Sequence, residues 1–220
     1  MASHIHIPKG GPVPDMVHFH TIGFQLIYCY KGWVKLVYED QGEPFILNEG
    51  DCVNQPPQIR HQVLEASDNL EVIEIGIPAV HMTTIDHEMK LPNDEINLDR
   101  IFKGQKFRRF IKDENDWEKT ATNGLQKLST QMEDYTGNIA NINVFKTDLN
   151  TLENLSTTSD INFFFILKGK CIINSNLQAE KLSIGDAFVL PKNSAYSLTE
   201  CSEKLEMLSV EITDLNLIQS

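Results

Sequence analysis

The chain has 220 residues, of which 41% are hydrophobic and 23% are charged, and its formal net charge is −12. This composition excludes a disordered chain, and the length allows one large or two small domains. An acidic surface repels nucleic-acid phosphates and anionic lipid headgroups. We therefore expect neither nucleic acid nor a membrane as a partner.

The four cysteines stand among apolar neighbours and form no CxxC pair; they are Cys29, Cys52, Cys171 and Cys201. Such usage is typical of buried free thiols in a reducing compartment. The first residues, MASHIHIPKGGP, contain no apolar run that would indicate a signal peptide, and no segment has the apolar length of a membrane span. We therefore expect a cytoplasmic protein.

Short runs of aromatic and β-branched residues follow one another between residues 24 and 78, separated by turn residues such as Gly32, Gly42 and Gly50. That spacing predicts an all-β sandwich or barrel. The pattern then dissolves into polar, proline-bearing sequence. We expect a first barrel over residues 1–90, a short helical or irregular connector over residues 91–104 and a second barrel over residues 105–220.

The second half of the chain repeats the first. Three blocks match in order: Tyr30–Tyr38 with Leu167–Ser175, Leu47–His61 with Leu182–Tyr196, and Leu70–Gly76 with Leu205–Glu211. The offset is 137 for the first block and 135 for the other two, so the difference falls within one hairpin. A period of this length is too long for a solenoid and predicts two tandem barrels.

One group of polar residues has the spacing of a metal-binding site. In the stretch HFHTIGFQ, His18 and His20 alternate with one residue and therefore share one face of a strand. Gln25 opens the next strand, and His61 comes from a strand further along the chain. Three imidazoles and one amide oxygen on the inner wall of a barrel predict a divalent metal site with positions open for a ligand.

These residues resemble the two motifs of the cupin superfamily. The first motif is matched by His18, His20, Gln25 and Gly32, and the second by Gly50, Pro56, Gln58 in a glycine position, and His61. The resemblance implies two antiparallel jelly-roll barrels (a bicupin), with His18, His20, Gln25 and His61 as metal ligands, and a possible homodimer. Gln25 replaces the usual glutamate, so a bound ion would keep more positive charge and Gln25 could not act as a base.

The second barrel has no such ligand set. At the repeat offsets, Leu155, Thr157, Asn162 and Tyr196 stand at the positions of His18, His20, Gln25 and His61. The stretch NFFFILKG also brings phenylalanine bulk to the expected cavity. We expect a degenerate, metal-free second barrel that packs against the first or forms a dimer contact.

A general base has to come from outside the motif. Glu65, Glu71 and Glu74 are the nearby carboxylates, and regular alternation puts Glu65 on the same face as His61, so Glu65 is the predicted catalytic residue. The same alternation points Arg60 outward. His4 and His6 have the spacing of His18 and His20 without the accompanying motif, and we expect them not to bind metal.

Two classes of function stay open. The first is an enzyme with one divalent ion (Fe, Zn, Mn or Ni) that acts on a small oxygen-bearing organic substrate. The ligand set resembles that of cupins acting on unsaturated uronates, which implies isomerase or lyase chemistry on a sugar acid, and three histidines also fit cupin dioxygenases. The second class is a non-catalytic small-molecule binder or sensor.

Overall fold

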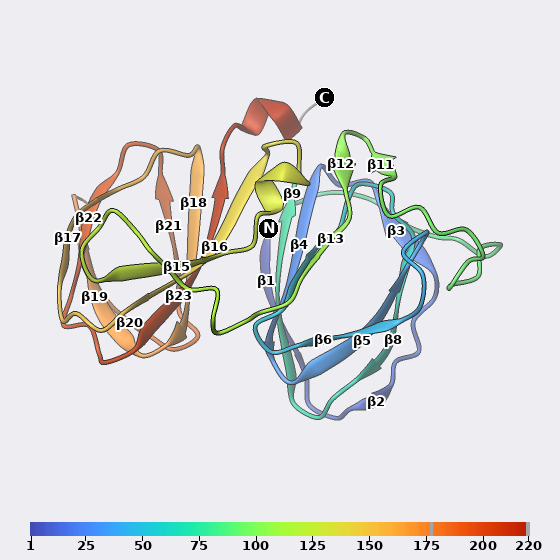
Figure 1. The fold of residues 1–220 in the computed structure, drawn as a ribbon, viewed down its shortest axis with the longest axis horizontal. Helices are drawn as coiled ribbons and strands as arrows, with labels where there is room; N and C mark the ends of the chain where they lie inside the picture. The colour runs from blue at the N-terminus through green and yellow to red at the C-terminus, as the bar shows by residue number, and fades with distance from the viewer. Residues whose placement is uncertain (177, 219–220) are drawn as a thin grey trace. The chain divides into compact units, whose positions relative to one another are not determined.

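The computed structural model describes residues 1–176 and 178–218, and it consists mainly of antiparallel strands (Figure 1). Its contacts divide the chain into two compact units. The first is mainly Met1–Lys112 with Asp134–Gly137, and the second consists of Asp113–Glu133 and Asn138–Leu217. Within the described residues, no helix has the length and apolar character needed to cross a membrane.

The first unit contains two main sheets and a small hairpin. One sheet has the strand order β1-β9-β4-β7-β13, and the other has the order β10-β3-β8-β5-β6, with β2 joined to β8. The strands are β1 (Ala2–Ile7), β2 (Gly11–Pro12), β3 (His18–His20), β4 (Phe24–Lys31), β5 (Trp33–Tyr38), β6 (Phe45–Asn48), β7 (Cys52–Asn54), β8 (His61–Ala66), β9 (Leu70–Ile77), β10 (Thr83–Ile85), the hairpin pair β11 (Ile101–Phe102) and β12 (Gln105–Lys106), and β13 (Arg108–Phe110).

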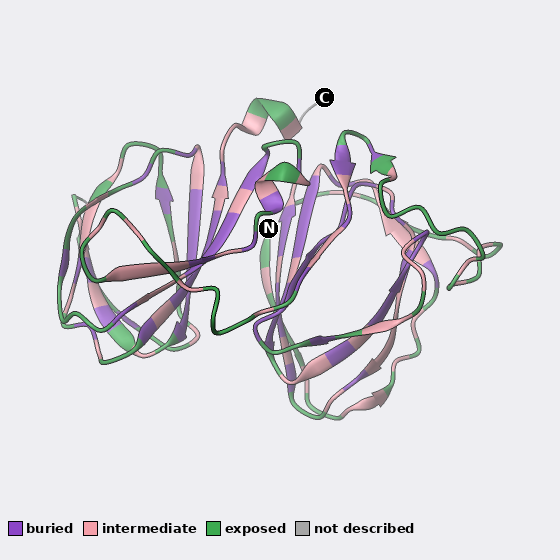
Figure 2. Cartoon of the chain, in the orientation of Figure 1, coloured by how far each residue is buried: buried purple, intermediate pink, exposed green. Residues whose placement is uncertain are grey.

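The core of this unit lies between the two main sheets. Val53 and Val72 come from the first sheet, and Leu36, Tyr38 and Leu47 from the second, and all five belong to one buried cluster. Buried positions alternate with more exposed ones along several strands (Figure 2). The expected strands between residues 24 and 78 are therefore present, and their inward faces close an apolar core.

The segment after β9 is irregular apart from short strands. Thr83–Ile85 forms β10 and pairs with β3, and no helix is present in residues 91–104, all of which the structure describes. Arg108–Phe110 forms β13 and pairs with β7 of the first unit. The contacts therefore divide the chain after Lys112, whereas the sequence pattern suggests a division at residues 104 and 105.

The second unit also contains two sheets. Their orders are β14-β15-β16-β23-β18-β21 and β17-β22-β19-β20. The elements are β14 (Glu118–Lys119), β15 (Leu125–Ser129), the 3-10 turn η1 (Met132–Asp134), β16 (Ala140–Thr147), β17 (Leu152–Ser156), β18 (Ile161–Lys168), β19 (Lys170–Ser175), β20 (Ala179–Ser183), β21 (Ala187–Pro191), β22 (Ala195–Thr199), β23 (Leu205–Ile212) and η2 (Leu215–Ile218).

The two units repeat the same hairpin. Gly32 has a φ of 77°, and the next residue donates its backbone N–H to Ser67 Oγ over 2.9 Å. In the second unit Gly169 has a φ of 82°, and the next residue donates to Ser202 Oγ over 2.9 Å. A Cβ at either glycine would lie 2.3 Å from that serine oxygen. Both hairpins therefore need glycine for its conformation and for the close approach.

The repeat extends to the turn before the last motif histidine. Gln58 has a φ of 66° and donates its backbone N–H to the carbonyl oxygen of His20 over 3.0 Å. Asn193 has a φ of 62° and donates to the carbonyl oxygen of Thr157, also over 3.0 Å. The glycine position of the motif is thus a left-handed position, which Gln58 fills at a conformational cost. The four cysteines are free and buried, as expected.

Candidate metal centre

Three histidines meet on two neighbouring strands. His18 on β3 lies opposite His61 on β8 in the antiparallel register, and His20 follows one step of alternation later on β3. The ring centroids of His18 and His61 are 4.2 Å apart, and those of His20 and His61 are 5.2 Å apart. One nitrogen from each ring lies within 4.8 Å of the others, so the three could hold one metal ion.

Each of these rings uses its Nδ1 atom for a hydrogen bond within the protein. His18 Nδ1 lies 2.8 Å from the Met16 carbonyl oxygen, His20 Nδ1 lies 2.8 Å from Thr83 Oγ1, and His61 Nδ1 lies 3.1 Å from the Ile59 carbonyl oxygen. A carbonyl oxygen can only accept, so Nδ1 of His18 and His61 carries the proton. The lone pair of each Nε2 is then directed away from these partners, as metal-binding histidines require.

The surroundings keep two of the rings uncharged. Burial, with further contributions from the neighbouring His18 and His81, lowers the pKa of His20 to about 4. Burial also holds the pKa of His61 well below its ordinary value, with a further contribution from His18. Both imidazoles are therefore neutral at pH 7, the form that binds metal ions.

Gln25 lies beside the triad and is held by two side-chain hydrogen bonds. Gln25 Nε2 donates to Glu74 Oε1 over 2.7 Å, and Gln55 Nε2 donates to Gln25 Oε1 over 2.9 Å. Gln55 Nε2 also lies 3.0 Å from His61 Nε2, and Tyr38 donates its hydroxyl to Gln55 Oε1 over 2.8 Å. Gln25 Oε1 accepts one hydrogen bond and has a second lone pair, so Gln25 as a fourth ligand stays a prediction. The sequence pattern did not identify Gln55 as a residue of the site.

Glu65 does not share the inward face with His61, which corrects the expectation from regular alternation. Lys35 pairs with Glu65, and the next residue on β5, Leu36, pairs with Val63, so β8 contains an irregularity at Leu64. This extra residue shifts the alternation, and Glu65 takes the face of Lys35 while Val63 and Leu36 line the cavity. The carboxylate that lines the cavity is Glu74 on β9.

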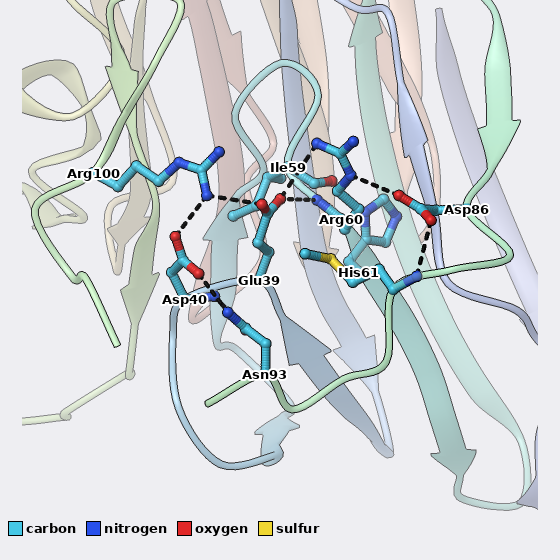
Figure 3. A network of polar contacts seen from close by, with 9 residues as sticks. Glu39, Asp40, Ile59, Arg60, His61, Asp86, Asn93 and Arg100 are labelled. Atoms are coloured by element: carbon cyan, nitrogen blue, oxygen red, sulfur yellow. Dashed lines mark hydrogen bonds and ion pairs between the residues drawn. The ribbon is translucent and has the colours of Figure 1, made fainter. Parts of the chain in front are cut away.

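A polar network lies close to His61 and holds the segment after β9 on the barrel (Figure 3). Arg60 donates its Nε to Asp86 over 3.1 Å, and Arg100 Nη1 lies 2.7 Å from the buried Glu39. The Arg60 guanidinium also lies 4.7 Å from the ring centre of Phe19. Phe19 and Arg60 alternate with the metal-site histidines, so this contact joins β3 and β8 on the opposite face.

The triad lies at one end of a cavity of about 280 Å³ inside the first unit. The polar residues at that end are His18, His20, Gln25, Tyr38, Gln55, His61 and Glu74, and the rest of the lining is aliphatic. His4 and His6 are outside it, because Ile5 and Ile7 are the β1 residues that face the cavity. The pair His4 and His6 has the same spacing as the pair His18 and His20, so this spacing alone does not decide which pair faces inward.

The second unit has a cavity of its own, of about 330 Å³. Leu155, Thr157, Asn162 and Tyr196 line it, and Leu155 pairs with Tyr196 as His18 pairs with His61. Phe164 of the stretch NFFFILKG lines this cavity, so phenylalanine bulk is present there as expected, and it leaves the cavity open. The side chains at these positions offer hydroxyl and amide groups and no imidazole.

The residues of the first unit fit a divalent ion. The test is the hydrogen bonding of the rings: His18 and His61 donate through Nδ1 to carbonyl oxygens and so present an unprotonated Nε2, and the Thr83 hydroxyl can accept a hydrogen bond from His20 Nδ1 in the same way. Gln55 is the group that contacts one of these nitrogens, and it is a neutral amide that a metal ion could displace. Imidazole nitrogens suit Zn, Fe and Ni alike, whereas Mn prefers oxygen ligands, so the three rings do not choose among the first three ions.

No family model matches the sequence, and no curated protein matches it. Among solved structures, the chain is similar to salicylate 1,2-dioxygenase from Pseudaminobacter salicylatoxidans, with a TM-score of 0.70 and 14% identity over 96% of this chain and 70% of that chain. A structure of that enzyme with gentisate gives a TM-score of 0.65 and 16% identity, covering 96% of this chain and 67% of that chain.

A mutant of oxalate decarboxylase from Bacillus subtilis is also similar, with a TM-score of 0.65 and 13% identity over 97% of this chain and 69% of that chain. At these identities the likeness establishes the fold. The chain has the antiparallel all-β fold of these structures, arranged in two units of two main sheets each, and its first unit carries a three-histidine group that could bind a metal ion.

Proposed function

We propose that this protein is a metal-dependent enzyme that acts on a small oxygen-bearing organic molecule inside its first barrel. The observation that carries the proposal is the convergence of three imidazoles whose Nδ1 atoms are all held by the protein. One nitrogen of each ring could contribute to a shared ion, and the three rings line the polar end of a cavity in the first unit. A site built in this way has both a place for an ion and a place for an organic ligand next to it.

The residues around the cavity would have different roles, according to where each one lies. His18, His20 and His61 would hold the ion, which would act as a Lewis acid toward a substrate oxygen. Gln55 and Gln25 keep the surrounding dipoles in fixed directions through their mutual hydrogen bond. Glu74 faces the cavity and could accept a proton from a bound hydroxyl or an acidic C–H group, a role for which Glu65 is on the wrong face.

Dioxygenase chemistry is the branch that this site supports best. A three-imidazole site leaves positions for both an organic ligand and dioxygen, and both oxygen atoms can enter the product without an external reductant. Isomerase or lyase chemistry on a sugar acid needs a paired acid and base. In this cavity Glu74 is the carboxylate that lines the wall, and it already accepts a hydrogen bond from Gln25.

A non-catalytic binder or sensor is the second candidate, and one observation favours it. Gln55 lies within hydrogen-bond distance of both His61 and Gln25, so the polar end is internally satisfied without an ion. A pocket of this kind could bind a small molecule and do no chemistry. A cytoplasmic location and a homodimer remain predictions made from the sequence.

The test is turnover by the full chain loaded with Fe(II), Mn(II), Zn(II) or Ni(II). Oxygen uptake with phenolic and diketone compounds would report the dioxygenase branch, and anaerobic loss of the double bond of unsaturated uronates would report the isomerase or lyase branch. Activity that the His61→Ala variant lacks would support the enzyme. Ligand binding with no turnover in either assay would favour the binder.

A further inference from the structure

Two of the four cysteines, Cys171 and Cys201, face each other in the second unit. Cys171 lies on β19, and Cys201 follows β22, the strand that pairs with β19 (Figure 1). Both belong to one buried cluster, and the Cys171 thiol donates a hydrogen bond to the Cys201 sulfur. Two nucleophilic sulfurs are therefore in contact at a place outside the candidate metal centre.

The backbone around the two cysteines defines how they are paired. Ser202 donates its N–H to the carbonyl oxygen of Lys170 over 2.9 Å, and Lys170 donates its own N–H to Ser202 Oγ over 2.9 Å. A backbone bond between the residue after Cys201 and the residue before Cys171 flanks a non-hydrogen-bonded pair of an antiparallel ladder. The Cα atoms of such a pair are about 4.5 Å apart, and disulfides span Cα separations of about 4.4–6.8 Å. A bond between the two sulfurs therefore requires no shift of the strands.

The first unit has the same arrangement without thiols. Val34 and Ala66 stand at the positions of the two cysteines in the repeat, and they are register partners in the pairing of β5 with β8. The backbone bond that flanks them, from Ser67 to the carbonyl oxygen of Trp33, is also 2.9 Å long. The fold thus accepts a valine opposite an alanine here, and packing alone does not call for two cysteines.

The other two cysteines are not placed to bond with each other. Cys52 is the register partner of Tyr28, so Cys29, the next residue on β4, lies on the opposite face of that sheet. Cys29 and Cys52 are 0% exposed, whereas Cys171 and Cys201 are 3% and 5% exposed. The chain therefore contains its own control pair of cysteines.

The local chemistry also separates the pair from the other thiols. Burial raises the pKa of Cys29 to about 12, so this thiol stays protonated at neutral pH. The hydrogen bond from Cys171 instead lowers the pKa of Cys201 from its ordinary value. The residues next to the pair along the chain, Lys170 and Glu203, are exposed, so the pair lies near the surface of the unit. Because the thiolate is the reactive form, oxidation should begin at this pair.

We propose that Cys171 and Cys201 are a redox modification site, at which hydrogen peroxide forms a reversible disulfide that joins β19 to the end of β22. One sulfur attacks the peroxide as a thiolate, the O–O bond breaks, and a sulfenic acid and one water form. The second thiol attacks that sulfur, the S–S bond forms, the S–O bond breaks, and a second water leaves. The pair gives up two electrons and two protons. A thiol reductant restores both thiols by exchange.

The experiment is a disulfide map of the full chain. Protein reduced with dithiothreitol and desalted is treated with hydrogen peroxide in a buffer that contains a chelator, so that trace metals do not catalyse the oxidation. The remaining thiols are blocked with N-ethylmaleimide in denaturant. Trypsin cleaves after lysine and releases residues 171–181 and 193–204 as separate peptides with one cysteine each. We expect these two peptides to be joined in the treated protein and separated again by dithiothreitol, with Cys29 and Cys52 blocked in both samples.

Three variants give a second readout. The disulfide restricts the unfolded chain, so peroxide should raise the melting temperature of the wild type. Cys171→Ala and Cys201→Ala each remove one sulfur and should abolish this rise, and Cys29→Ala is the matched control that should retain it. The peptide map of the wild type decides the question even where a variant folds poorly.

Three results would overturn the inference. The first is that both peptides of the treated wild type carry N-ethylmaleimide. The second is that either cysteine ends as a sulfinic acid or in a bond to another chain. The third is a bond that forms equally well between Cys29 and Cys52, which would mean that the oxidant acts on unfolded protein. None of these results bears on the metal centre, because the two sites lie in different units.

Discussion

Gln55 Nε2 lies 3.0 Å from His61 Nε2, the nitrogen that a metal ion would use. His61 donates through Nδ1 to the Ile59 carbonyl, so the Gln55 amide is the donor in this contact. The amide therefore occupies a ligand position of the ion. Gln55 is expected to stabilise the metal-free barrel and to be dispensable for metal binding.

The Gln55→Leu variant tests this expectation. It leaves the Tyr38 hydroxyl and Gln25 Oε1 without their partner in a buried place, which costs about 1–3 kcal/mol in the metal-free protein. Metal content should stay at the wild-type level, because the three imidazoles are intact. Thermal unfolding of the metal-free protein and metal analysis of the loaded protein measure the two effects. Loss of metal on this change would show instead that Gln55 is needed to hold His61.

Thr83 fixes the orientation of His20 from outside the motif. Its Oγ1 lies 2.8 Å from His20 Nδ1, across the pairing of β10 with β3. Thr83→Val keeps the shape and removes the acceptor, and loss of such a partner typically lowers metal affinity about 10–100-fold. Competition with a chelator measures the affinity.

Thr84→Val is the matched control for this prediction. Thr84 is the next residue on β10 and stands opposite Phe19, so its side chain takes the other face of the strand. Its replacement should change metal affinity less than twofold. Equal losses in the two variants would mean that β10 acts through the stability of the strand and not through His20.

Gln58 occupies a left-handed position where the family motif has glycine. A non-glycine residue there costs roughly 1–2 kcal/mol, against a backbone-entropy cost of about 0.5–1 kcal/mol for glycine. Gln58→Gly should therefore stabilise the first unit by about 0.5–1 kcal/mol. Asn193→Gly should change the second unit little, because asparagine adopts this conformation readily.

Denaturant unfolding measures both effects, with Trp33 reporting the first unit in a Trp117→Phe background and Trp117 reporting the second unit in a Trp33→Phe background. A loss of stability in Gln58→Gly would show that the glutamine side chain makes a contact that outweighs its backbone strain.

Glu211 is a carboxylate held in the cavity of the second unit, and burial raises its pKa above the ordinary value of 4.5. A raised folded-state pKa means that the folded unit binds the proton more tightly than the unfolded chain. The stability contribution is thus present below pH 4.5 and is lost as the pH rises through the folded-state value. Glutamine does not titrate, so the Glu211→Gln variant does not lose this stability as the pH rises.

The melting temperature of the Glu211→Gln variant should therefore exceed that of wild type by a margin that grows as the pH rises above 4.5 and becomes constant above the folded-state pKa of Glu211. Ser159 and Ser209 lie within 3.5 Å of the carboxylate oxygens and can bond a glutamine as well. A constant margin across this range would show that the Glu211 carboxyl titrates as it does in the unfolded chain.

The sequence predicted which segments carry the three histidines, and it predicted the all-β architecture. Alternation at His18 and His20 and the distance to His61 are local regularities, and the structure brings all three together. The repeat was visible as well, because its hairpins need a glycine at residues 32 and 169. Where the backbone conformation at one position requires a particular residue type, that residue can be recognised in the sequence.

The remaining parts of the site depend on non-local geometry. The expectation that Glu65 shares the face of His61 was wrong, because the irregularity at Leu64 shifts the alternation of β8 and the sequence gives no sign of it. Gln55 and Thr83 contact the site from β-strand ends and pairings that no local pattern encodes. Interruptions of regular strands therefore limited the prediction of the site most.

The most direct test of the metal centre is the metal content of tag-free protein in three forms: wild type, His61→Ala and His6→Ala. His6 belongs to the outward-facing pair on β1 and is the matched control. We predict one equivalent of divalent metal in wild type and in His6→Ala, and its loss in His61→Ala. Wild-type protein that binds no metal after incubation with each candidate ion, or a His61→Ala variant that retains a full equivalent, would contradict the metal centre.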